Sequence, residues 1–135
     1  MSQIDTTLDE ICNAQYVSLE TFRKNGQGVK TPIWQACEKG KLYMWTDAKS
    51  WKIKRLRNNS RVNVCKSDSQ GKPLGDWVEA QAIVLDDPEL AKRYRQLVGT
   101  KYRPWFWIFA FVAFIRRADY AIIEVDLSNA QHIES

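Results

Sequence analysis

The segment from Trp45 to Lys52, with the sequence WTDAKSWK, contains the residue types that bind a phosphate group. An alternating strand pattern precedes it and a helical pattern follows it. The unpaired backbone N–H groups and the positive dipole end at a helix start attract anions. Thr46 and Ser50 can donate hydroxyl hydrogen bonds, and Lys52 supplies a compact positive charge. The segment predicts an anion site, although a plain solvated helix would carry the same pattern.

The charge distribution supports an anionic partner. The net charge is +4, but residues 1–22 carry four acids and no Lys or Arg, whereas residues 49–61 carry six basic residues and no acid. Such a cluster predicts a phosphorylated cofactor, a nucleic acid or a membrane surface as the partner. A solvated helix face is the alternative.

Histidine and cysteine usage restricts the chemistry. His132 is the single histidine, which disfavours a metal site built on His and excludes Ser-His-Asp catalysis unless the C-terminal residues fold back. Cys12, Cys37 and Cys65 form no CxxC pair, and the odd count favours free thiols. Together with the absence of an export-signal pattern, this predicts a cytoplasmic protein without a metal.

The elements around the segment form a mainly β pattern. Pro32 interrupts the second predicted strand, which places that stretch at an edge or beside a groove. The predicted helices span Ile4–Asn13, Asp47–Asn58 and Asp86 to about Val98, and the predicted strands span Tyr16–Arg23, Val29–Glu38, Lys41–Thr46, Arg61–Lys66, Trp77–Leu85 and Tyr120–Leu127. Six short antiparallel-type strands with a few helices predict one domain, residues 1–135, built as a closed or partly closed barrel.

Four stretches resemble the pyridoxamine 5′-phosphate oxidase-like superfamily of flavin-binding split barrels. The greatest similarity is to its short deazaflavin (coenzyme F-420)-dependent oxidoreductases. The stretches are Thr31–Trp34, Lys41–Thr46, Ser50–Val62 and Gly75–Ala80. The family pattern has a strand ending in Thr, then Ser-x-Lys, then Leu-x-x-Asn-Pro-Arg-Val. Ser60 stands here where proline is usual, which changes a turn.

The resemblance implies a six-stranded antiparallel split β-barrel with a few flanking helices, and it implies a cofactor site. The cofactor would be FMN or, alternatively, the deazaflavin coenzyme F-420, bound at a homodimer interface. Its phosphate would contact Ser50, Lys52 and Lys30, where Lys30 replaces a more usual Arg. The residues implied in cofactor binding are Lys30, Pro32, Ile33, Trp34, Trp45, Thr46, Ser50, Lys52 and Trp77, the last from the second subunit. Barrel core is the alternative role of Trp45 and Trp77.

The resemblance also implies an oxidoreductase that acts on an unidentified small molecule. No catalytic residue can be named, because the cofactor itself would carry the hydride. A flavin carrier without turnover is one alternative. A barrel that binds single-stranded nucleic acid is another, but the sequence lacks an aromatic stripe interleaved with basic residues, so no nucleic-acid partner is expected.

The segment Trp105–Ile115 consists of eleven apolar residues with Arg103 before it and Arg116 and Arg117 after it. It is shorter than the about 20 residues that a membrane-spanning helix needs. Three interpretations are open: a core or dimer-interface helix, a peripheral membrane contact, and an apolar wall over the cofactor that would select a lipophilic substrate.

Overall fold

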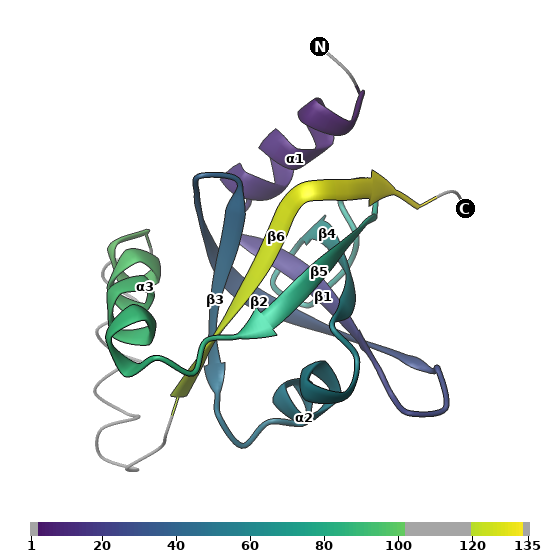
Figure 1. The fold of residues 1–135 in the computed structure, drawn as a ribbon. Helices are drawn as coiled ribbons and strands as arrows, with labels where there is room; N and C mark the ends of the chain where they lie inside the picture. Colours follow the sequence, from purple (N-terminus) through teal and green to yellow (C-terminus); the bar gives the residue numbers. More distant parts are fainter. Residues whose placement is uncertain (1–2, 102–119, 134–135) are drawn as a thin grey trace.

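The computed structural model describes residues 3–101 and 120–133, and these form a β-barrel with three helices around it (Figure 1). The helices are α1 (Gln3–Asn13), α2 (Trp51–Asn58) and α3 (Pro88–Lys101). The strands are β1 (Tyr16–Phe22), β2 (Gly28–Glu38), β3 (Lys41–Asp47), β4 (Arg61–Ser67), β5 (Val78–Val84) and β6 (Tyr120–His132). The apolar segment Trp105–Ile115 lies outside the described residues. None of the helices described is long and apolar enough to span a bilayer.

The strands close into a barrel in the order β1-β2-β3-β6-β5-β4, and every neighbouring pair is antiparallel. Alternation of side chains places Val17 and Leu19 of β1 and Val62 and Val64 of β4 in a fully buried interior. The predicted mainly β fold with a six-stranded antiparallel barrel is therefore confirmed. β6 continues five residues beyond the predicted end at Leu127, because its C-terminal part pairs with β5 as far as His132.

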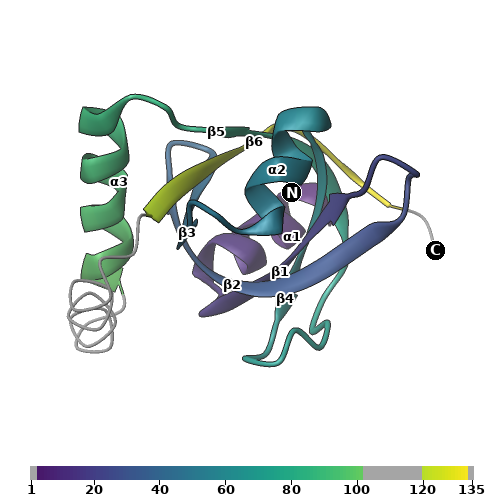
Figure 2. The ribbon, with the colours of Figure 1, turned by 90° about the horizontal axis from the view of Figure 1, so that it is seen from below.

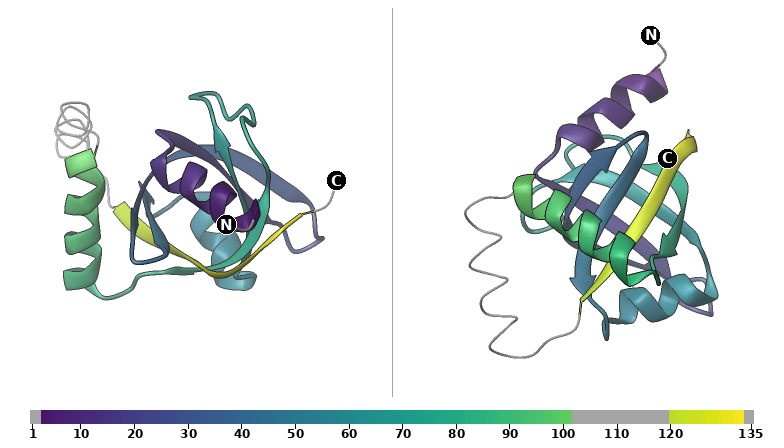
Figure 3. Two further views of the ribbon diagram at one scale, coloured as in Figure 1. Left: turned by 90° about the horizontal axis from the view of Figure 1, so that it is seen from above. Right: turned by 60° about the vertical axis from the view of Figure 1, so that its left-hand side comes forward.

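The helices α1 and α2 close the two ends of the barrel, as the view along its axis shows (Figure 2). Ile11 of α1 and Ile53 and Leu56 of α2 belong to the same buried cluster as the interior of the barrel. The third helix, α3, lies outside the barrel, against strands β2, β3 and β6 (Figure 3). There Tyr94 of α3 stacks on Tyr43 of β3 with 3.6 Å between ring centroids.

The helix α2 begins at Trp51, so the predicted start at Asp47 is wrong. The side chain of Asp47 accepts a hydrogen bond from the backbone N–H of Lys49, and its carbonyl accepts one from the N–H of Ser50. These local bonds hold the chain in a turn, as Asp side chains often do ahead of a helix. Ser50 therefore takes the N-cap position rather than a place inside the first turn.

The C-terminal end of α1 is attached to the barrel by one covalent bond and several hydrogen bonds. Cys12 and Cys37 form a disulfide, so the expectation that both are free thiols is wrong; only Cys65 is free, and it is buried. The cysteines are far apart in sequence, but α1 packs across β2 at Cys37. The fully buried amide of Gln35 donates hydrogen bonds to three carbonyls at this helix end, and Lys101 Nζ donates to two of the three. A helix end leaves its last carbonyls unpaired, and these donors satisfy them.

Candidate functional site

A gap between β2 and β3 is the most distinctive feature of the barrel wall. The ladder between these strands runs from Glu38–Lys41 to Gln35–Met44 and stops there. Beyond it the first half of β2 stays paired with β1, while the last half of β3 stays paired with β6. The strands therefore diverge at Trp34 and Trp45, and the wall of the barrel opens on the side of α2.

A groove of about 240 Å³ lies in this gap. Its lining residues are Pro32, Ile33 and Trp34 from β2, Trp45 and Thr46 from β3, and Lys52 from α2. All six belong to the nine residues that the sequence predicts as a cofactor site. The prediction that Pro32 borders a groove is confirmed, since β2 passes this residue without a partner on the side of β3.

The walls of the groove are supported from behind. Trp34 and Trp45 pack against the cluster that α3 forms on the outside of the barrel, and Trp34 also lies 6.4 Å from Tyr16, ring centroid to ring centroid. On the other side the loop after β4 approaches Pro32 at Gly71. A Cβ at Gly71 would come within 3.3 Å of the proline ring, and the positive φ of 88° also favours glycine there. Both contacts hold the aromatic wall and the proline in fixed positions.

Among the residues that the structure describes, Lys52 is the one charged side chain that lines the groove. Burial, followed by the positive charge of Arg55, lowers the pKa of Lys52, while Asp47 opposes the shift. No ion pair with Lys52 is found in the described part of the chain. Partial burial of an ammonium group that has no ion pair is costly, and an anion in the groove would offset that cost.

Ser50, two residues before Lys52, has a hydroxyl for which residues 3–101 and 120–133 supply no hydrogen-bond partner. Its backbone is extended, with φ −68° and ψ 154°, as an N-cap requires, but its side chain makes no cap hydrogen bond. The Oγ atom is buried and has no partner among the described residues. Ser50 does not line the groove itself, yet it starts the helix that carries Lys52 into the groove. A buried hydroxyl without a partner is uncommon in native proteins and indicates a missing ligand or water.

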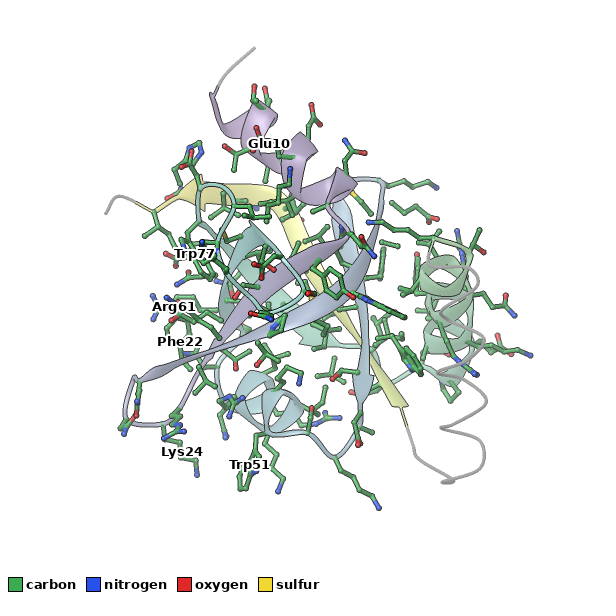
Figure 4. All side chains as sticks on the ribbon, turned by 180° about the vertical axis from the view of Figure 1, so that it is seen from behind. Glu10, Phe22, Lys24, Trp51, Arg61 and Trp77 are labelled. Atoms are coloured by element: carbon green, nitrogen blue, oxygen red, sulfur yellow. A yellow bond between two sulfur atoms is a disulfide. The ribbon has the colours of Figure 1, made fainter. Side chains whose placement is uncertain are left out.

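Lys30 and Trp77 lie together but outside the groove of this chain. The Lys30 ammonium is 4.9 Å from the Trp77 ring centroid, at the distance of a cation–π contact. Lys30 is exposed and precedes Pro32 by two positions, so both side chains leave the same face of β2. Trp77 lies directly before β5, and Figure 4 shows it well separated from Trp51 of α2. Lys30 does not line the groove of its own chain, and its contact with a cofactor phosphate stays a prediction.

The turn between β1 and β2, which the structure places beside α2, was not among the predicted site residues. Arg23 and Lys24 of this turn line a second cavity together with the basic face of the helix. The basic run at residues 49–61 was a signal for this region. The turn itself could not be assigned to it, because nothing in a single sequence fixes the packing of a hairpin loop on a helix. No group of three or more His, Cys, Asp or Glu side chains suited to a metal occurs within residues 3–101 and 120–133.

No model of a known protein family and no curated protein sequence matches the chain. Solved structures match it over nearly its full length. A putative pyridoxamine 5′-phosphate oxidase from Listeria innocua is 14% identical, with a TM-score of 0.65 over 99% of this chain and 100% of that chain. An F420 reductase is 19% identical, with a TM-score of 0.60 over 91% and 94% of the two chains. The haem-storage protein HutZ from Vibrio cholerae is 11% identical, with a TM-score of 0.66 over 96% and 92%.

The sequence identities of 11–19% mean that these matches establish a common fold and not a common ligand. The three proteins are themselves named for different ligands or activities. The feature common to the chain and these structures is the barrel with its flanking helices, and it agrees with the resemblance found in the sequence. The chain therefore has the split-barrel fold of the pyridoxamine 5′-phosphate oxidase-like proteins.

Proposed function

We propose that the chain binds FMN, or alternatively the deazaflavin coenzyme F-420, in the groove between β2 and β3, and that it acts as an oxidoreductase on a small molecule. The observation that carries this proposal is the composition of the groove. Its six lining residues are all among those that the sequence resemblance implies in cofactor binding. The fold alone would not have required this agreement.

The phosphate of the cofactor fits the side of the groove formed by α2. Lys52 would neutralise its charge, and the hydroxyls of Ser50 and Thr46 would donate hydrogen bonds. The Oγ of Ser50 is buried and has no hydrogen-bond partner among the described residues. Rotation of this side chain towards the groove would let it donate to a phosphate oxygen, which supports the fit. Backbone N–H groups at the start of an eight-residue helix add a favourable field.

The ring of the cofactor fits the side formed by the two strands. The backbone of Pro32, Ile33 and Trp34 would run along one edge of the ring, and the indoles of Trp34 and Trp45 would exclude water. A bound cofactor of this type supplies hydride transfer, and the protein supplies its placement and electrostatic environment. No side chain is assigned a catalytic role.

A second copy of the chain would complete the site. The groove of about 240 Å³ is smaller than the roughly 300–1,000 Å³ typical of sites that enclose a small molecule, so one copy covers only part of the cofactor. We infer a homodimer with the cofactor at its interface, in which Trp77 of the second copy covers the ring. Lys30, adjacent to Trp77, would then reach the phosphate side of the partner.

Titration of the purified protein with FMN and with coenzyme F-420, in separate experiments, tests the proposal. We expect Lys52→Ala to raise the dissociation constant of the preferred cofactor about 10–150-fold, the equivalent of about 1.5–3 kcal/mol for a hydrogen bond to a charged group. Lys92→Ala, at an exposed lysine on α3, is the matched control and should leave the constant unchanged. Equal constants for Lys52→Ala and the wild type would show that the phosphate lies elsewhere.

Turnover separates the enzyme from a carrier. A protein that binds the cofactor but does not oxidise its reduced form with any acceptor offered would be a carrier. A Soret band after addition of haem, with no binding of either flavin-type cofactor, would instead favour haem. The groove provides no histidine as an axial ligand for haem iron among the described residues. The single histidine, His132, shares a 2.8 Å hydrogen bond with Thr7 instead.

A further inference from the structure

A second cavity, of about 380 Å³, lies between the turn after β1 and the outer face of α2. From the hairpin it is lined by Phe22, Arg23 and Lys24, and from the helix by Trp51, Lys54, Arg55 and Asn58. We call it the hairpin cleft. It shares no lining residue with the groove between β2 and β3. Figure 4 shows Lys24 and Trp51 projecting on the same side of the molecule.

The residues of the hairpin cleft are held in place by local structure. The four helical residues are spaced three, four and seven positions apart, so they form one continuous face of α2, opposite the buried Ile53 and Leu56. The hairpin loop is fixed by hydrogen bonds from the Arg23 N–H to the Gln27 carbonyl and from the Gly26 N–H to the Arg23 carbonyl. The loop is thus fixed in itself, and a hydrogen bond from Arg55 Nε to Thr21 Oγ1 joins α2 to the strand that leads into it.

The charge of the hairpin cleft is strongly positive and is not neutralised. Four of its seven lining residues are cations, and none is an acid. The four ion pairs found in the described part of the chain involve none of these cations. Arg55 donates a 2.7 Å hydrogen bond to the hydroxyl of Thr21, while burial and then the charge of Arg23 lower its pKa. Like charges held this close repel each other, and an anion between them would remove the repulsion.

An exposed aromatic ring lies beside these cations. Trp51 is 68% exposed, which is exceptional for a tryptophan, and the ammonium of Lys54 is 4.3 Å from its ring centroid. Phe22 also lines the cleft, but it is buried and the guanidinium of Arg61 lies 4.1 Å from its ring centroid, so Trp51 offers the accessible aromatic face. Aromatic faces next to unpaired Arg and Lys bind a base together with its phosphates, by stacking and by charge.

We propose that the hairpin cleft is a binding site for a free nucleoside polyphosphate. The base would stack on Trp51, and the phosphates would lie among Arg23, Lys24 and Arg55. Four unneutralised cations match the charge of a triphosphate better than that of a single phosphate. The volume of the cleft is within the range of small-molecule sites. This ligand is additional to the flavin-type cofactor, and its site does not depend on the groove.

Calorimetric titration of the full chain with ATP at fixed ionic strength tests the inference. We expect Trp51→Ala and Arg23→Gln each to raise the dissociation constant of ATP about tenfold or more, the size of a lost base stack or phosphate contact. Both side chains are exposed, so both variants should fold. Ile83→Ala and Lys92→Gln, at an exposed apolar position on β5 and an exposed lysine on α3, are the matched controls and should leave the constant unchanged.

Three further titrations can overturn the proposal. Inorganic tripolyphosphate that binds as tightly as ATP would show that no base is recognised. A short oligothymidylate that binds at least ten times more tightly than ATP would assign the cleft to single-stranded nucleic acid rather than to a free nucleotide. If Lys52→Ala loses ATP binding while Trp51→Ala binds ATP as the wild type does, the nucleotide lies in the groove and not in the hairpin cleft. Unaltered FMN binding in Trp51→Ala keeps this test separate from that of the cofactor.

Discussion

Replacement of Ser50 by alanine should separate helix capping from ligand binding, because the two roles predict opposite results. A serine at an N-cap usually stabilises its helix, and its loss costs about 0.5–2 kcal/mol. Here the side chain makes no cap hydrogen bond, and its Oγ is buried with no partner among the described residues. A buried hydroxyl in that state costs about 1–3 kcal/mol relative to a satisfied one.

From these values we expect Ser50→Ala to leave the free energy of unfolding of the cofactor-free protein unchanged or to raise it by up to about 1 kcal/mol. The same variant should weaken FMN binding, since a hydrogen bond to a charged phosphate contributes about 1.5–3 kcal/mol, which corresponds to a 10–150-fold rise in the dissociation constant. A gain or no change in stability combined with a loss of affinity is typical of a residue that serves a ligand.

Urea unfolding followed by tryptophan fluorescence gives the stability, and quenching of FMN fluorescence gives the affinity. Ser60→Ala is a matched control, because the Ser60 hydroxyl is hydrogen-bonded to Gln81 Oε1 at 2.5 Å and lies at the end of α2 remote from Ser50. It should cost up to about 1 kcal/mol of stability and leave FMN affinity unchanged. The reasoning about Ser50 is refuted if Ser50→Ala loses 0.5–2 kcal/mol of stability, the usual cost of a lost cap, while binding FMN as the wild type does.

Three further predictions concern the attachment of α1. Gln35→Leu removes the donor to three carbonyls, so chemical denaturation should show a loss of about 3 kcal/mol, whereas a change below 1 kcal/mol would mean that water replaces the amide. Cys12→Ser should cost about 3.5 kcal/mol, the entropy of a loop with a sequence separation of 25, and reductant should destabilise the wild type equally but leave the variant unaffected. Burial lowers the pKa of Lys101 from 10.5 to about 8. Between these two pH values the unfolded chain binds more protons than the folded chain, so the free energy of unfolding should rise with pH in that window. Lys101→Met should flatten that rise, which parallel urea titrations at several pH values would detect.

The sequence was sufficient to predict the order and type of the elements, because each strand carries a two-residue alternation and each helix a three-to-four-residue one. Three residues of the groove follow from the residue pattern, because Pro32 interrupts a strand and Thr46 and Lys52 flank a helix start. Ile33, Trp34 and Trp45 came from the family resemblance. The start of α2 was missed because an Asp side chain competes with the helix for backbone N–H groups, and single-sequence patterns do not show which one prevails.

The contact of Lys30 with Trp77 and the disulfide of Cys37 with Cys12 were not predicted, for a different reason. Both depend on how elements far apart in sequence lie against each other. Lys30 faces Trp77 because β2 and the loop before β5 meet on the outside of the barrel, and Cys37 meets Cys12 because α1 crosses that end of β2. Residue types and spacing contain no information on these contacts, whereas they do determine which face of a strand a residue occupies.

The position of β6 between β3 and β5 has a consequence for folding during synthesis on the ribosome. The first five strands are synthesised before β6, yet β3 and β5 each have β6 as a neighbour, as in residue 47 pairing with residue 120 and residue 84 with residue 123. Until the last strand emerges, two apolar edges remain open, and such edges can pair with other chains. Pairings so distant in sequence also form slowly. The nascent chain is therefore protected from aggregation only when residues 120–132 have been synthesised and have paired with β3 and β5.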